Sequence, residues 1–340
     1  MPPRGTVVAL AAGCLLATGC WSSTNSEVVV YTALDSEFSE PIFAEFTKAA
    51  SIHVLPKFDA ESTKTVGLAE AIIAERARPR CDVFWNNEIL HTIRLEKLGL
   101  LTVYRPPSAT SYPPMYRSPA DTWHGFAARA RVLLVNTKLL SQAQRPRSVL
   151  DLANPDWRGR AGIAKPLFGT TATHAACLFA LWGEPKAEAF FRKVKANDVK
   201  IFSGNKQVAL AVAAGQVAFG LTDTDDALAE VEKASPVAIV YPDQGDGQMG
   251  TLFIPNTLAI VAGSPHPEAA RRLVDYLLSP EVEARLAAGP SAQIPLNSAV
   301  MVKPRVETPK TIRAMQVDFS AAADRWTAAA RFLRDEFTGG

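Results

Sequence analysis

Three carboxylates close together are the clearest chemical signal in this chain. Asp223, Asp225 and Asp226 follow an apolar run over residues 217–221 and lead into a helical pattern over 226–233. Hard cations accept several carboxylates, and a carboxylate also binds an organic ammonium group through charge-assisted hydrogen bonds. An Asp before a helix can equally serve only as its N-cap. The sequence leaves these interpretations open.

A second group of polar residues opens predicted helices and suits an anion. Helix N termini present free N–H groups and a partial positive charge, which seat phosphate or carboxylate oxygens. Arg129 could add a bidentate grip on an oxyanion. The alternative is ordinary helix capping, or a surface salt bridge for Arg129. The helix-opening residues are Ser62 and Thr63, Gly169 with Thr170 and Thr171, and Asn205.

The elements that position these residues alternate between strands and helices. Short apolar runs typical of buried strands include 28–31, 82–85, 131–136, 162–164, 217–221, 238–241 and 258–262. Helical patterns fill the gaps at 172–182, 186–196, 207–214 and 267–278, and a last helix is expected over 311–337. This alternation predicts an α/β fold with a largely parallel sheet.

Residues 1–20 have the pattern of a secretory signal. Arg4 precedes a mostly apolar run over 6–18, which is too short to span a bilayer, and a small residue precedes Cys20. Ala-Thr-Gly-Cys resembles a lipobox, although Ala17 stands where Leu is usual. We therefore expect a lipoprotein anchored through Cys20, in the periplasm or at the cell surface, with residues 21–27 as a tether.

Composition excludes several classes of protein. The chain has 36 basic and 34 acidic residues, a net charge of +2 and no long basic run, which argues against a nucleic-acid partner. The length beyond the signal suggests two lobes rather than one core. Cys81 and Cys177 are too few for a disulfide framework or a zinc site, so buried free thiols are expected. Nucleophile-elbow, P-loop and zinc-protease motifs are missing from the sequence, so we expect no enzyme.

Several segments resemble, in the same order, the ferric-ion-binding family of periplasmic solute-binding proteins. They are VVVYTALDSEF, CDVFWNNE, RARVLLVNT, VLDLANPDWRGRAGIAKP, SGNKQVALAVAAGQVAFGLTDTDDA and LVDYLLSPEVEARLAAGPSAQIPLN. The resemblance implies a type II periplasmic-binding-protein fold with two crossover strands, near Arg131 and Leu258, and a ligand cleft between two lobes. It implies a monomer whose lobe closure is sensed by an ABC permease in the membrane. The implied lobes are residues 28–130 with 258–300, and residues 131–257, while a C-terminal helix in 301–340 packs on a lobe.

The resemblance also implies positions for the ligand. Ferric-binding relatives hold iron with two adjacent tyrosines, and alignment places Asp225 and Asp226 there. Asp35 and Asn87, with Glu88 beside the latter, occupy the first-lobe positions. A metal ion such as Fe(III) would then use Asp35, Asp225 and Asp226 with an oxyanion.

A small aminoalkyl phosphonate fits the same mixture of carboxylates and anion donors. Two other functions remain open at this level. The chain could be a receptor that reports its ligand to a membrane sensor, or, less in keeping with its motifs, a surface-anchored enzyme.

Overall fold

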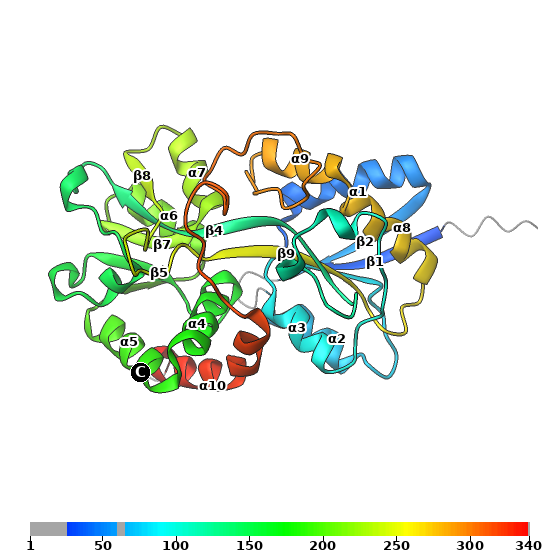
Figure 1. Cartoon of the computed structure of the whole chain (residues 1–340), viewed down its shortest axis with the longest axis horizontal. Coiled ribbons are helices and arrows are strands. Elements are labelled where there is room, and N and C mark those ends of the chain that lie inside the picture. The colour runs from blue at the N-terminus through cyan, green and yellow to red at the C-terminus, as the bar shows by residue number, and fades with distance from the viewer. Residues whose placement is uncertain (1–25, 60–64, 339–340) are drawn as a thin grey trace, which may run out of the picture.

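Two long strands run through the middle of the molecule and connect its halves (Figure 1). Strands β4 (His124–Asn136) and β9 (Phe253–Ile260) are buried along their whole length and pair antiparallel with each other. β9 continues into the sheet of the first lobe, whereas β4 continues into the sheet of the second. The computed structural model describes residues 26–59 and 65–338, so the predicted signal, Cys20, Ser62 and Thr63 lie outside the described residues.

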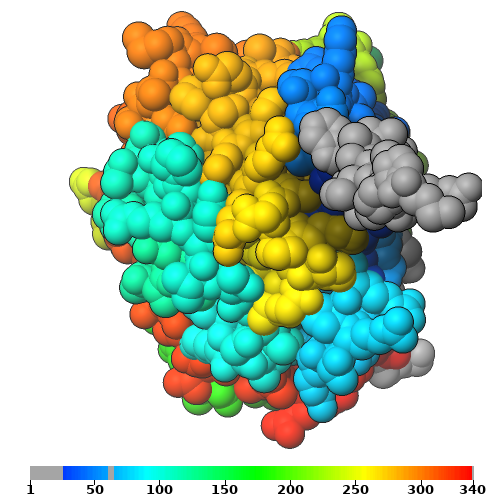
Figure 2. Space-filling model, turned by 90° about the vertical axis from the view of Figure 1, so that its right-hand side faces the viewer, coloured from blue at the N-terminus to red at the C-terminus, as the bar shows by residue number. Residues whose placement is uncertain are grey.

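The first lobe combines segments from both ends of the chain. Its sheet has the order β2-β1-β3-β9, in which β1 is parallel to its two neighbours and β3 is antiparallel to β9. Figure 2 shows its outer face, where the gold and orange segment that carries α8 and α9 lies between blue and cyan N-terminal segments. The elements are β1 (Ser26–Thr32), α1 (Ser36–Ala50), β2 (Ile52–Phe58), α2 (Val66–Ala74), β3 (Val83–Asn86), α3 (Leu90–Lys97), α8 (Pro267–Leu277) and α9 (Pro280–Ala288).

The second lobe has its own sheet, of order β4-β7-β5-β6, with β8 paired to β4. β5 is parallel to β6 and β7, and β4 is antiparallel to β7 and β8. Its elements are β5 (Ala161–Ala164), α4 (Gly169–Trp182), α5 (Glu184–Ala196), β6 (Lys200–Phe202), α6 (Asn205–Ala213), β7 (Phe219–Asp223), α7 (Thr224–Glu232) and β8 (Val237–Val240). Short 3₁₀ turns are Ala109–Ser111, Pro114–Tyr116, Gln142–Gln144, Val149–Ala153 and Pro155–Trp157.

The C-terminal helix differs from the prediction in its start and in its packing. Helix α10 (Phe319–Thr338) begins at Phe319 rather than near Thr311, because the preceding segment forms a bridge to the second lobe in which Thr251 pairs with Ala314. α10 packs on α3 of the first lobe as well as on α4 and α5 of the second (Figure 1). It therefore bridges the two lobes instead of resting on one.

Most predicted elements are confirmed, with small shifts at their ends. β1 begins at Ser26, so the last two residues of the predicted tether belong to a strand. The α/β class and the two lobes are as expected, and Cys81 and Cys177 are buried free thiols. Among the described residues, no helix has the length and apolar character needed to cross a bilayer.

Candidate ligand-binding cleft

A cavity of about 440 Å³ lies between the lobes, a size suited to a small-molecule ligand. Three helices begin at its wall: α1 follows Asp35, α6 starts at Asn205, and α7 follows Asp223. Arg129 enters from the connecting strand β4. The cavity is thus built from helix N termini and the ends of strands, which is where an α/β sheet presents backbone donors.

Arg131 is buried and is the centre of a polar network that reaches the cavity wall. Its Nη1 donates to Asp223 Oδ1 at 2.6 Å and to Thr170 Oγ1 at 3.0 Å, and its Nη2 donates to Thr171 Oγ1 at 3.1 Å. Thr170 and Asn205 donate to the second oxygen of Asp223, at 2.6 and 3.0 Å. The charge of Asp223 is therefore neutralised by the protein itself, and both of its oxygens already accept hydrogen bonds.

Arg129 lies two residues earlier on β4, and its hydrogen-bonding groups are only partly matched, although several carboxylates lie near its charge. Its Nη1 lies 3.3 Å from Asp225 Oδ2, and the two side chains are 6% and 13% exposed. The Arg129 Nε and Nη2 atoms and Asp225 Oδ1 are buried and have no hydrogen-bond partner among the described residues. Buried polar groups are normally hydrogen-bonded, so these atoms indicate a position for a ligand.

Burial and the guanidinium of Arg129 have opposite effects on the pKa of Asp225. Burial raises the pKa of this carboxyl group, and the guanidinium of Arg129 lowers it. The nearby Asp223 and Asp35 raise the pKa further. A positively charged ligand group would lower it again by replacing lost solvation, because an opposite charge favours the ionised form.

Two amide side chains add further unpaired acceptors at the cavity wall. Asn87 Oδ1 and Gln207 Oε1 are buried without a partner in the described part of the chain. Asn87 comes from the first lobe after β3, and Gln207 from the first turn of α6 in the second. Together with Asp225 Oδ1 they offer three oxygens, the number that a primary ammonium group can satisfy with its three N–H donors.

The predicted site residues are divided among several roles. The cavity wall contains Asp35, Asn87, Arg129, Thr170, Asn205, Asp223, Asp225 and Asp226. Gly169 and Thr171 do not line it: Gly169 begins α4 with a positive φ of 56°, and Thr171 supports Arg131 and Asn205.

Glu88 also lies outside the cavity wall. It is fully buried and accepts hydrogen bonds from the backbone N–H groups of Leu90 and His91 at the start of α3, and from the Asn86 side chain. Thr173, on α4 of the other lobe, donates to Glu88 Oε2 at 2.9 Å. Glu88 therefore connects the two lobes and, unlike its neighbour Asn87, does not line the cavity.

Two site residues were missed at the level of the sequence. Arg131 was counted as part of an apolar strand, although it is two residues from Arg129 and alternate residues of a strand share one face. That spacing was the available signal. Gln207 follows Asn205 on the opening turn of α6, a position marked only by the helix start.

The acidic cluster does not favour a bare metal ion. Oxygens of Asp223, Asp225 and Asp226 lie within 4.8 Å of one another, close enough to share an ion. However, Arg131 pairs with Asp223 and Arg129 with Asp225. A cation at this point would face two guanidinium groups, so this arrangement of donors suits a metal poorly.

The family model for bacterial extracellular solute-binding proteins matches residues 92–322, more than half of the chain. The chain belongs to this family. It is a solute-binding receptor of an ABC importer. The receptor is 25% identical over 319 residues to an Fe(3+)-binding periplasmic protein of Serratia marcescens, covering 92% of each chain.

Two further relatives differ in the ligand that their names give. One is a putative 2-aminoethylphosphonate-binding periplasmic protein of Salmonella typhi, 25% identical over 261 residues, which cover 74% of the receptor and 72% of the relative. The other is the crystal structure of iron-bound HitA from Pseudomonas aeruginosa, which has a TM-score of 0.82 at 25% identity and covers 91% of the receptor and 99% of that chain. These relatives are binding proteins that take chemically different ligands.

Proposed function

We propose that the receptor captures a small zwitterion, with one oxyanion and one ammonium group, in the cleft between its lobes. An aminoalkyl phosphonate has this form. The observation that carries the proposal is the partly matched pair of Arg129 and Asp225, whose buried Nε, Nη2 and Oδ1 atoms have no partner among the described residues. The Nε and Nη2 edge of a guanidinium suits a phosphonate or carboxylate bidentately.

The ammonium group then binds beside the oxyanion, at Asp225. Asp225 Oδ1 supplies the negative charge, and the unpaired oxygens of Asn87 and Gln207 supply two neutral acceptors. Because Asn87 belongs to the first lobe and Gln207 to the second, one ammonium group would contact both. Contacts that form only on closure provide the free energy that shifts the receptor towards its closed form.

Closure is the signal that we propose the permease recognises. In this proposal residues 28–130 with 258–300 form one moving lobe and residues 131–257 the other. β4 and β9 serve as the hinge, because they are the strands shared by the two sheets. Lipidation of Cys20 would hold the monomeric receptor at the membrane near its permease.

Half-ligands give a direct test of the proposal. Purified receptor, first dialysed against a chelator, is titrated calorimetrically with 2-aminoethylphosphonate, ethylphosphonate, ethanolamine and ferric citrate. We expect measurable binding of the zwitterion and binding at least about tenfold weaker for each half-ligand, since each lacks a charge-assisted contact worth about 1.5–3 kcal/mol. The Arg129→Gln variant should lose the preference for the phosphonate, and the Asp225→Asn variant the preference for the amine.

The same titrations separate the zwitterion from the second candidate, a ferric ion with an accompanying oxyanion. That candidate is favoured by the three neighbouring carboxylates. Tight binding of ferric citrate that disappears in the Asp225→Asn variant, together with no response to the zwitterion, would replace our proposal with the metal. Equal affinities for the zwitterion and ethylphosphonate would show that the ammonium group makes no favourable contact, and that part of the proposal would be wrong.

A further inference from the structure

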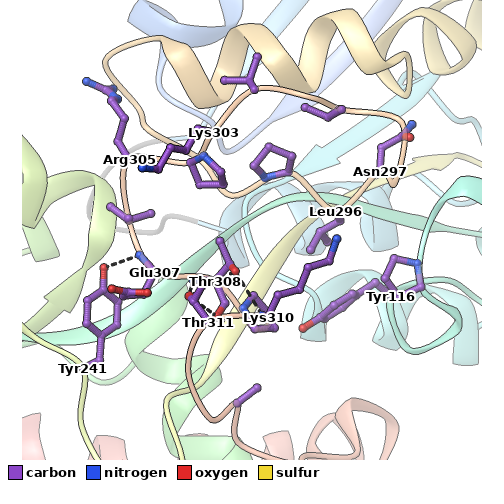
Figure 3. A pocket seen from close by; sticks show the side chains of 18 of the residues that line it. Tyr116, Tyr241, Leu296, Asn297, Lys303, Arg305, Glu307, Thr308, Lys310 and Thr311 are labelled. Atoms are coloured by element: carbon purple, nitrogen blue, oxygen red, sulfur yellow. Dashed lines mark hydrogen bonds between the residues drawn. The ribbon is translucent and has the colours of Figure 1, made fainter.

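A second and larger cavity lies away from the cleft and shares no lining residue with it. This groove has a volume of about 930 Å³. One wall is the segment 295–316, which we call the strap. The opposite wall is formed by Tyr116, in the 3₁₀ turn Pro114–Tyr116, and Tyr241, just after β8 (Figure 3). The groove therefore contacts the first lobe at one side and the second lobe at the other.

The strap is fixed at both ends, so the groove is a defined surface rather than a gap beneath a loose loop. At its start the backbone N–H groups of Leu296 and Asn297 donate to buried Glu283 of α9. At its end the Arg313 backbone N–H donates to Gln244 Oε1 at 2.9 Å, beside the bridge to Thr251. Between them, the Glu307 N–H donates to the Tyr241 hydroxyl at 2.9 Å (Figure 3).

The lining combines apolar surface with unmatched positive charge. Met115 is 48% exposed and Val302 is 36% exposed. The ammonium groups of Lys303 and Lys310 have neither a hydrogen-bond nor an ion-pair partner in residues 26–59 and 65–338. The Lys310 side chain extends across the groove towards Leu296 and Tyr116 (Figure 3).

We propose that this groove is a second ligand site that takes a small amphipathic anion. Charge complementarity identifies the anionic group, which Lys310 and Lys303 would bind. The apolar body would lie against the exposed side chains of Met115 and Val302, since exposed apolar surface of this kind marks binding sites. The occupant would lie between the strap and the first-lobe segment that carries Met115 and Tyr116, and the inference does not depend on which ligand fills the cleft.

Two fluorescent probes test the site in the full-length receptor. Anilinonaphthalene sulfonate has an aromatic body and one anionic group, and N-phenylnaphthylamine is its uncharged counterpart. We expect the sulfonate to bind the wild type at one site and the Lys303→Gln/Lys310→Gln variant about tenfold more weakly, because two partly exposed ion pairs are lost. The uncharged probe should bind both proteins equally.

A charge-matched control removes two exposed lysines elsewhere. The Lys48→Gln/Lys138→Gln variant has the same net charge as the test variant but an intact groove, and it should bind the sulfonate like the wild type. The proposal is overturned if both double variants lose the same affinity, since the effect would then be general charge. It is also overturned if the wild type does not bind the sulfonate. The same holds if only the Arg129→Gln/Asp225→Asn cleft variant loses sulfonate binding, because the probe would then bind in the cleft.

Discussion

Arg131 and Arg129 differ by two positions on one strand, and we predict different consequences for their loss. Replacing Arg131 by methionine leaves Asp223, which is 2% exposed, as an uncompensated buried charge. Breaking a buried pair by removing one partner costs about 3–5 kcal/mol. Thr170 and Thr171 lose a hydrogen bond in the same step. We expect the free energy of unfolding to fall by about 4 kcal/mol, a large part of the total for a typical protein.

A double variant separates the charge from the shape of the side chain. In Arg131→Met/Asp223→Leu both charges are gone, and replacing a buried ion pair by apolar side chains is often close to neutral. We expect the double variant to recover at least about 2 kcal/mol of the loss caused by Arg131→Met alone. Urea denaturation, followed by tryptophan fluorescence, gives both values from the midpoint at constant slope.

Arg129→Met should behave differently in the same assays. Its ion pair with Asp225, at 3.3 Å, borders the cavity, where Asp225 can be hydrated or take up a proton. We expect a loss of only about 1–2 kcal/mol in unfolding free energy, together with loss of zwitterion binding. If both single variants lose equal stability, or if the double variant is less stable than Arg131→Met, our division into a structural and a ligand-binding arginine is wrong.

Three further predictions concern closure and pH. Thr173→Val removes the interlobe hydrogen bond to Glu88. The affinity for the zwitterion, measured by calorimetry, should then fall about fivefold, because the closed form loses a contact. An unchanged affinity would show that this bond does not stabilise the closed form. Burial, aided by neighbouring arginines, lowers the pKa of His91 and His174 from 6.5 to about 3. The unfolded chain therefore binds more protons below pH 6.5, so lowering the pH to 5 should cost about 2 kcal/mol of unfolding free energy per histidine. His174→Leu should show a shallower urea-midpoint profile over this range, and an unchanged slope would contradict the assignment. Because burial raises the pKa of Asp225, zwitterion affinity should decline as the pH falls towards that pKa, and Asp225→Asn should lack this dependence in calorimetry.

The sequence was most informative where hydrophobic patterns decide the structure. The apolar runs at 131–136 and 217–221 correspond to the second half of β4 and to most of β7, because buried strands of an α/β sheet read as continuous apolar segments. The start of α10 was predicted too early. The alanines and bulky residues of that segment continue the helical pattern, but pairing with Thr251 keeps residue 314 extended. A long-range contact of this kind leaves no periodic signal.

The roles of individual polar residues were less predictable than their presence. Glu88 stands beside Asn87 in the chain, yet one faces the cavity and the other faces α4, because neighbouring residues after a strand point in different directions. Asp223 and Asp225 differ in the same way, since only Asp223 is completely hydrogen-bonded within the protein. The role of each polar residue depends on which residues from distant segments of the chain lie next to it in the fold. The residue type alone does not determine these neighbours.

The charges of the cleft explain why a zwitterion suits it better than either ion alone. A simple cation at Asp225 would have to displace Arg129, and a simple anion at Arg129 would have to separate it from Asp225. In each case one largely buried charge would lose its partner, which is costly. A zwitterion can insert between the two groups and provide each with a new opposite charge. The partly matched pair of Arg129 and Asp225 would therefore select for charge separation within the ligand. The pair of Arg131 and Asp223, in which both carboxylate oxygens accept hydrogen bonds within the protein, holds the surrounding helices in place.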